Sequence, residues 1–365
     1  MAFIHTIETA VPDNYFLQDY ARDALKASTS DRLTQRIIHR LYSQSGIHKR
    51  HSVVHDFNAD ADEGLFYSPQ ENTFKSPSTK VRNDLYAEAA KPLYTRVAKN
   101  ALNASQFSAD DVTHVITVSC TGFFAPGPDF YVVKNLCLHP STQRFHVGFM
   151  GCYAAFPALK MARAFCDADP DAVVLIVCLE LCTLHLQLGA DMDRMLSASV
   201  FADGAGAALV SAKRPQRDEQ KRVLELSQLE TTLTPTGEED MAWTVGDNGF
   251  DIVLSSYVPD ILETNLEAAL TPLFASLGRT PDEVQHWAIH PGGRAILDKI
   301  QRGLALSEEQ LEPSRQTLFE YGNMSSATVL FVLKEVMQRA QPKESVCAMA
   351  FGPGLTVESG VFTVC

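Results

Sequence analysis

Short apolar runs alternate along the chain with longer segments of helical composition. Runs that are rich in β-branched or other apolar residues predict buried strands at 112–119, 144–149, 172–179, 201–210, 287–289, 346–351 and 355–364. Helix formers dominate 153–166 and 325–338 between them. All the apolar runs are far shorter than the roughly 20 residues that a membrane span needs. The pattern predicts a soluble α/β protein with no membrane segment.

Two pairs of five-residue segments echo one another along the chain. The pairs are DDVTH at 110–114 with DEVQH at 282–286, and GCYAA at 151–155 with GNMSS at 322–326. Their offsets, 172 and 171 residues, agree within one residue, and both pairs fall at strand-to-helix transitions. A constant offset indicates an internal duplication.

The echoes therefore divide the chain into two similar halves. We expect halves at 1–215 and 216–365, with the boundary in the polar, charged stretch 213–222. In this interpretation Cys152 and Asn323 occupy equivalent helix N-termini.

Composition narrows the class of partner. The net charge of −13 argues against nucleic acid, and an anionic substrate would need a local basic patch that the total conceals. The N-terminus shows no signal peptide, and most of the eight cysteines lie in apolar segments, as expected for a reduced, cytoplasmic protein. Cys178 and Cys182 are four apart without a His-rich partner segment, so we expect no metal site.

Three residues could together carry chemistry. Cys152 lies between a predicted strand and a predicted helix, where the helix N-terminus favours a thiolate; a buried structural cysteine is the alternative. His290 ends a strand before Pro-Gly-Gly, and Asn323 precedes a helix, where it could simply be an N-cap. A thiolate, an imidazole and an amide suit acyl transfer with a stabilised oxyanion. Papain-like cysteine hydrolases use the same residue types, so a synthase and a hydrolase both stay open.

Several segments resemble the chalcone synthase family, the type III polyketide synthases. In chain order they are 119–129 (SCTGFFAPGPD), 151–152 (GC), 201–209 (FADGAGAAL), 290–298 (HPGGRAILD), 321–331 (YGNMSSATVLF) and 351–358 (FGPGLTVE). The resemblance spans nearly the whole chain. It implies the thiolase-like α/β fold, in which two duplicated βαβαβαββ halves form five α-β-α-β-α layers, in agreement with the echoes.

The resemblance also assigns roles. Cys152 would carry the acyl chain, His290 and Asn323 would stabilise an enolate, and Phe201 would be the gate between the coenzyme A tunnel and the cavity. Ala125 matches a loop that reaches the partner's cavity, which implies a homodimer. Positions that line the cavity in this family are Cys120, Thr121, Cys182, His185, Ile252 and Ser325. Lys49 and Arg50 fall near the family's basic coenzyme A contacts.

The implied reaction is a decarboxylative Claisen condensation. Malonyl-coenzyme A would extend an acyl-coenzyme A starter loaded on Cys152, with coenzyme A thioesters as substrates and no other cofactor. Cys182 and His185 stand where plant members have threonines, and residues 151–155 look bacterial. These departures favour an aliphatic starter and an alkylpyrone or alkylresorcinol product. The alternatives are a ketoacyl synthase or hydroxymethylglutaryl-type synthase on the same fold and, more distantly, a cysteine hydrolase; the GNMSS and FGPG segments favour the polyketide branch.

Overall fold

The structure is a computed structural model that describes residues 1–57, 64–187, 192–214 and 222–365. Its strands are β1 (Phe3–Ala10), β2 (Tyr15–Leu17), β3 (Lys49–His51), β4 (Tyr67–Ser68), β5 (Thr73–Phe74), β6 (His114–Ser119), β7 (Gln143–Gly148), β8 (Val173–Leu181), β9 (Asp203–Ser211), β10 (Leu224–Leu233), β11 (Met241–Gly246), β12 (Gly249–Leu254), β13 (His286–Ile289), β14 (Ser345–Gly352) and β15 (Thr356–Val364). Its α-helices are α1 (Gln18–Ala27), α2 (Arg32–Ser43), α3 (Thr79–Ala104), α4 (Pro128–Asn135), α5 (Ala155–Ala168), α6 (Met192–Val200), α7 (Val258–Leu277), α8 (Arg294–Gly303), α9 (Glu308–Tyr321) and α10 (Thr328–Arg339).

The main sheet consists of two similar parts. Strands β7, β6, β8, β9 and β1 lie side by side in the N-terminal half, and β13, β14, β15 and β10 follow the same order in the C-terminal half. β6 pairs in parallel with β8, as β13 does with β14, and the next pairs, β8 with β9 and β14 with β15, are antiparallel in both parts. β9 with β1 and β15 with β10 are also antiparallel, and β7 adds a further parallel pair with β6 in the N-terminal half alone. A short pairing of β1 with β10, at Phe3 opposite Glu225, joins them. The predicted duplication is confirmed.

One strand of the expected pattern differs between the halves. The N-terminal half contains the full βαβαβαββ order, but the described C-terminal half has α9 where the counterpart of β7 would lie. Helix α9 starts at a capping box formed by Ser307 and Gln310, which satisfies the first backbone donors of a helix. The sequence at this place therefore favours helix over strand.

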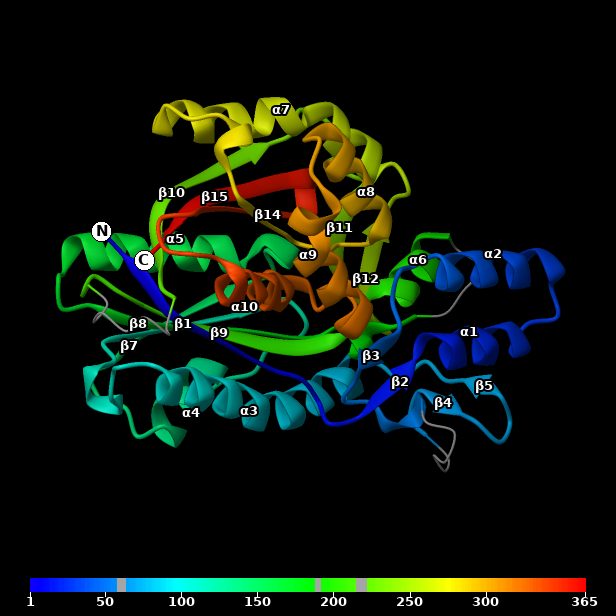
Figure 1. Ribbon diagram of the computed structural model, residues 1–365. Coiled ribbons are helices and arrows are strands. Elements are labelled where there is room, and N and C mark those ends of the chain that lie inside the picture. Colours follow the sequence, from blue (N-terminus) through cyan, green and yellow to red (C-terminus); the bar gives the residue numbers. More distant parts are fainter. Residues whose placement is uncertain (58–63, 188–191, 215–221) are drawn as a thin grey trace.

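Five layers stack from one side of the molecule to the other (Figure 1). Helices α3 and α4 cover the outer face of the N-terminal strands, and α7, α8 and α9 lie beyond the C-terminal strands. Helices α5 and α10 lie in the middle and contribute to one apolar core, for example through Leu159 and Leu333. This is the α-β-α-β-α arrangement that was expected.

Each of the two sequence echoes corresponds to a pair of equivalent 3-10 helices, one in each half of the chain. Short 3-10 helices at Ala109–Asp111 and Pro281–Glu283, each with a capping box, precede β6 and β13. Two others, Gly151–Tyr153 and Ser325–Ala327, lead into α5 and α10. Cys152 and Asn323 therefore approach the middle layer from equivalent positions. The predicted boundary at 215/216 lies outside the described residues.

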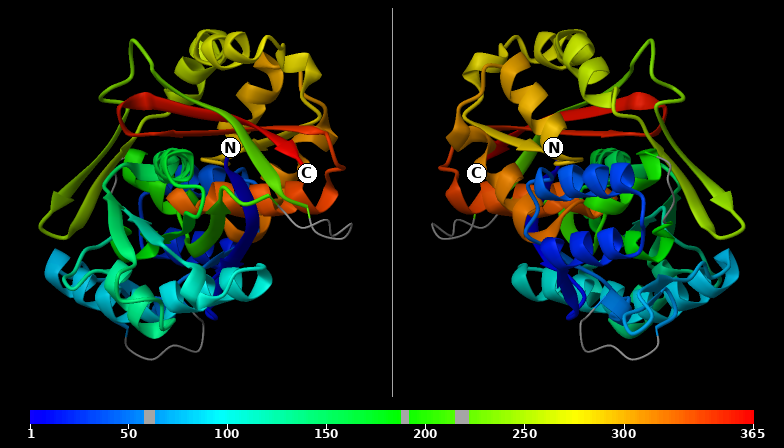
Figure 2. Two further views of the ribbon diagram at one scale, coloured as in Figure 1. Left: turned by 90° about the vertical axis from the view of Figure 1, so that its left-hand side faces the viewer. Right: turned by 90° about the vertical axis from the view of Figure 1, so that its right-hand side faces the viewer.

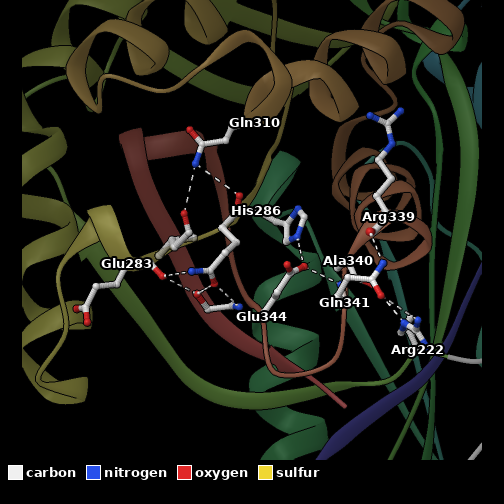
Figure 3. Close-up of polar contacts among 11 residues, drawn as sticks. Arg222, Glu283, His286, Gln310, Arg339, Ala340, Gln341 and Glu344 are labelled. Atoms are coloured by element: carbon white, nitrogen blue, oxygen red, sulfur yellow. Dashed lines mark hydrogen bonds and ion pairs between the residues drawn. The ribbon is translucent and has the colours of Figure 1, made fainter. Parts of the chain in front are cut away.

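Two further features stand apart from the main sheet. Strands β11 and β12 form an antiparallel hairpin that extends from the C-terminal half beside the N-terminal half (Figure 2), where β12 contacts α6. A polar cluster ties the start of β13 to the turn before β14 (Figure 3): Glu344 accepts hydrogen bonds from the backbone N–H of Gln341 and contacts His286 at 2.7 Å. Among the described helices, none combines the length and apolarity needed to cross a bilayer.

Candidate active site

Cys152 lies on the tight turn between β7 and α5. Gly151 adopts a φ of 77°, a conformation that favours glycine, and a side chain there would meet the ring of Pro353. Gly352, at the end of β14, packs against the ring of Tyr153. The Cys152 loop is thus held against the β14–β15 turn, which belongs to the other half of the chain.

A small cavity of about 40 Å³ opens beside Cys152. Its walls come from both halves and from the β11–β12 hairpin, and most of the side chains are apolar. The polar or reactive side chains among them are Cys120, Cys152, Cys182, Trp243, His290, Asn323 and Ser325.

His290 brings two unpaired nitrogens to this cavity. It follows β13 directly, and its backbone N–H donates to the carbonyl of Met349, so its position is fixed by the sheet. The residue is 1% exposed, yet neither Nδ1 nor Nε2 has a hydrogen-bond partner among the described residues. Buried polar atoms are nearly always paired. Burial lowers the pKa of His290 to about 3, so its imidazole is neutral near pH 7.

The side-chain amide of Asn323 is held in one orientation. Its Nδ2 donates to the carbonyl of Gly292 at 3.2 Å, and its Oδ1 accepts from the backbone N–H of Ser325 at 2.9 Å. Ser325 has a φ of 47°, a strained conformation for serine that places it at the cavity wall. Because Nδ2 carries two hydrogens, the amide can also donate to the sulfur of Cys152 or to a ligand that is bound there.

The thiol of Cys152 is not the resting thiolate that its helix position suggested. Burial raises its pKa to about 11, although hydrogen bonding from Ser325 and Asn323 acts in the opposite direction. Desolvation therefore outweighs the N-terminus of α5. A proton transfer from Cys152 to a neutral His290 would create two opposite charges together, whose attraction offsets part of the cost of burying each one.

Phe201 is linked directly to Asn323. The two residues form an isolated parallel bridge between the segment that joins α6 to β9 and the segment before α10. Phe201 is 6% exposed, lines the cavity and meets the indole of Trp243 edge-on at 6.3 Å. The proposed gate and the proposed enolate-binding amide are thus fixed to one another.

Four of the six expected cavity residues lie in the wall, namely Cys120, Cys182, Ile252 and Ser325. The other two, Thr121 and His185, do not line it. The hydroxyl of Thr121 donates to the carboxyl of Glu180. His185 donates from Nε2 to the carbonyl of Thr121, and its ring stacks on Phe250 at 3.9 Å. Both residues form a layer behind the wall.

The expected coenzyme A contacts differ in their surroundings. Lys49 forms an ion pair with Glu320 at 3.2 Å and keeps a partly exposed side chain. Arg50, expected as the second basic contact of coenzyme A, is 1% exposed and donates to the carbonyls of Ala198 and Phe201. Its burial gives it a packing position behind the gate residue.

The loop of Ala125 reaches solvent rather than the cavity of its own chain. Ala125 is exposed, and Phe123 beside it has an exposed fraction of 53%. Phe149, 41% exposed, has its ring 6.5 Å from that of Phe123.

Two residues of this region were missed from the sequence. Glu180, near the end of the buried strand β8, accepts hydrogen bonds from Ser326, Thr121 and the backbone N–H of Cys120. An acid within an apolar run was a signal that could have found it. Trp243 donates from Nε1 to the carbonyl of Cys120 at 2.8 Å and fills space beside the gate. It comes from a hairpin whose position no local pattern predicts.

Comparisons with known proteins agree with this geometry. The family descriptions "Chalcone and stilbene synthases, N-terminal domain" and "Chalcone and stilbene synthases, C-terminal domain" match residues 1–214 and 225–364. A protein of Mycobacterium tuberculosis named "Alpha-pyrone synthesis polyketide synthase-like Pks18" is 32% identical over all of this chain and 91% of its own length.

Solved structures show the same similarity. PKS-I from the brown alga Ectocarpus siliculosus has a TM-score of 0.92 and 30% identity, covering 100% of this chain and 98% of its own. The 1,3,6,8-tetrahydroxynaphthalene synthase of Streptomyces coelicolor A3(2), a bacterial type III polyketide synthase, has a TM-score of 0.86 and 26% identity, covering 100% and 99%.

Fold and cavity together define a condensing enzyme with the thiolase-like architecture. The chain belongs to the chalcone and stilbene synthase family, the type III polyketide synthases. This membership favours the polyketide branch over the ketoacyl synthase, hydroxymethylglutaryl-type synthase and cysteine hydrolase that the residue types left open.

Proposed function

We propose that the enzyme loads an acyl-coenzyme A starter on Cys152 and extends it with malonyl-coenzyme A. In loading, neutral His290 accepts the proton of the Cys152 thiol as sulfur attacks the thioester carbonyl. The bond between the carbonyl carbon and coenzyme A breaks, and the departing thiolate takes the proton back from His290. A thioester on Cys152 and free coenzyme A result.

In the extension step, the malonyl thioester carbonyl occupies the space before His290 and Asn323. Loss of carbon dioxide leaves its electron pair as an enolate, whose oxygen accepts hydrogen bonds from the imidazole N–H and the amide Nδ2. The enolate carbon then attacks the Cys152 thioester, the carbon–sulfur bond breaks, and the extended chain leaves on coenzyme A. The observation that supports this role most strongly is that neither nitrogen of His290 has a hydrogen-bond partner in the part of the chain that the structure describes.

The starter is an aliphatic acyl group and the product an alkylpyrone or alkylresorcinol. The relative from Mycobacterium tuberculosis is named for alpha-pyrone synthesis, and the wall of this cavity is mainly apolar with the small side chains of Cys120 and Cys182. An apolar wall suits a hydrocarbon chain, which offers no polar group to pair.

The test is product formation from malonyl-coenzyme A and a panel of acyl-coenzyme A starters. Cys152→Ala abolishes all extended products, because the chain then has no covalent attachment. Cys178→Ala, a change at a buried cysteine outside the cavity wall, retains them. Mass spectrometry of the products identifies the starter. Synthesis that persists in Cys152→Ala would refute the assignment.

The family resemblance further leads us to propose a homodimer in the cytoplasm. The aromatic patch of Phe123 and Phe149 lies beside Ala125 at the surface. Exposed apolar side chains of this kind often form part of an interface with another protein chain. The free cysteines, most of them buried, agree with a reducing compartment.

A further inference from the structure

A second and larger cavity, of about 190 Å³, lies beyond the gate residue. It is enclosed by α1, by the segment around β4 and β5, and by the N-terminal ends of α3 and α6, at the right-hand side of Figure 1. Its volume exceeds what one or two water molecules occupy. The part of its wall contributed by Phe16, Leu25, Phe66 and Phe74 is apolar.

Two buried arginines line this cavity. Arg50 and Arg82 are each 1% exposed. A guanidinium stays protonated in a protein, so both bring a full charge into a region shielded from water. Burial lowers the pKa of Arg82 to about 10, which still leaves it charged at neutral pH. Buried charges are normally paired, because an isolated one is costly.

Neither arginine has that pairing within the described part of the chain. Arg82 donates to the carbonyls of Pro77, Leu184 and Leu186, and its guanidinium stacks on Phe66 at 5.0 Å. These acceptors are dipoles, not charges, and no ion pair joins Arg82 to a described carboxylate.

The surroundings of Arg50 are similar. It donates to the side-chain oxygen of Gln18 and to two backbone carbonyls, and its guanidinium stacks on Phe16 at 4.8 Å. Asp203 attracts it only weakly and forms no ion pair with it. Arg50 also has the hydroxyl of Tyr42 as a hydrogen-bond partner. Among the described residues, the hydrogen-bond partners of both arginines are therefore carbonyls, an amide and a phenol, and none of them is a carboxylate.

Aromatic walls with two uncompensated cations match one class of ligand. We propose that this cavity binds a small amphiphile that carries a carboxylate head and an apolar chain. The carboxylate accepts hydrogen bonds from Arg50 and Arg82, which are charge-assisted and stronger than those to carbonyls. The chain packs against Phe16, Phe66 and Phe74. The site lies outside the catalytic cavity, and the inference does not rest on the condensation reaction.

The bound carboxylate would also touch the frame of the catalytic site. Arg50 holds the carbonyl of Phe201, and Arg82 holds the carbonyls on either side of His185. The second cavity is therefore linked to the gate residue and to the layer behind the catalytic cavity through the hydrogen bonds of its two arginines.

Binding of octanoate to the full-length protein tests the proposal. Cys152 is first alkylated with iodoacetamide, so that the condensation chemistry takes no part, and binding is measured by isothermal titration calorimetry. We expect saturable binding of octanoate and about tenfold weaker binding of octan-1-ol, which has the same chain without the charge.

Two matched substitutions on α1 locate the site. Ala24 lines the cavity and Ala27 does not. Ala24→Phe fills the cavity and weakens octanoate binding about tenfold or more, whereas Ala27→Phe leaves it unchanged. Arg82→Gln gives a second loss, with circular dichroism as the check on folding. The proposal is overturned if octanoate does not bind, if octan-1-ol binds as tightly, or if Ala24→Phe keeps the original affinity.

Discussion

His290 is the residue whose removal should act most directly on Cys152. Because the buried thiol has a pKa of about 11, its reactivity near pH 7 depends on a neighbour that accepts its proton. We expect His290→Ala to slow alkylation of Cys152 by iodoacetamide about tenfold or more at pH 7. Peptide mass spectrometry separates this reaction from alkylation of the exposed Cys137 and Cys365.

The matched control for this substitution is His286→Ala. His286 lies at the other end of the same strand, β13, and contacts Glu344 rather than the cavity. Alkylation should proceed there at the original rate. Equal rates in the two variants would show that His290 does not accept the proton.

Trp243 sets the space beside the gate. Trp243→Ala removes the indole from the cavity wall and leaves the carbonyl of Cys120 without its hydrogen bond. We expect longer starters to be accepted and the free energy of unfolding to fall by about 2 kcal/mol. Urea denaturation and the starter panel measure the two effects.

Trp243→Phe separates the two contributions. It keeps a ring in the wall but loses the N–H donor, so it should lose stability while preferring the starters of the original enzyme. A product spectrum in Trp243→Ala that matches the original would contradict the role of the indole in setting chain length.

Some residues of the site were predictable and others were not. The echo of 151–155 with 322–326 paired Cys152 with Asn323 from sequence alone, because equivalent turns recur in a duplicated fold. That the described residues offer no hydrogen-bond partner to the ring nitrogens of His290 depends on how the five layers pack together, which no local sequence pattern encodes. Trp243 lies on a hairpin from the other half, so its position beside Phe201 depends on tertiary packing and cannot be predicted from the local sequence.

At the level of elements, apolar runs located the strands to within a few residues. The run 172–179 became β8 at Val173–Leu181, and 346–351 became β14 at Ser345–Gly352. Helix starts were less accurate: 153–166 begins as a 3-10 turn and becomes α5 only at Ala155. Composition could not distinguish that turn, because its geometry depends on the left-handed backbone of Gly151 and on the nearby Pro353 from the other half of the chain.

The polar cluster between α10 and β14 gives a pH-dependent contribution to stability. The backbone N–H of Gln341 and then the side chain of His286 lower the pKa of Glu344 below 4.5. A depressed pKa means that the stabilisation is complete above pH 4.5 and is lost as the pH falls through the pKa of the folded state. We expect Glu344→Gln to lower the free energy of unfolding by about 0.5 kcal/mol at pH 7, a small value because the side chain is partly exposed.

Urea denaturation at several pH values measures this effect. The difference between the original protein and Glu344→Gln should shrink towards zero below pH 4. Glu239→Gln, at an exposed position, serves as the control and should show no such trend. A difference that persists unchanged at pH 3 would rule out the carboxylate as its source.

For the whole molecule, the middle layer explains why the halves cannot act separately. Helices α5 and α10 share one apolar core, so the turn that carries Cys152 and the turn that follows Asn323 are fixed relative to one another. His290 enters from β13 in the next layer. The duplication thus supplies two equivalent helix starts, and their divergence places a thiol at one, the nucleophile that we propose, and an amide at the other.

The exposed aromatic patch at Phe123 and Phe149 should determine assembly. A charge on each of these side chains would have to be buried in a dimer that covers them, at a cost of several kcal/mol. We expect the double variant Phe123→Asp, Phe149→Asp to elute as a monomer in size-exclusion chromatography with light scattering, where the original protein has twice the mass of one chain. Leu33→Asp, a change at an exposed leucine on α2, should remain dimeric. A dimer that survives the double substitution would place the interface elsewhere and remove the reason for expecting Ala125 in the partner's cavity.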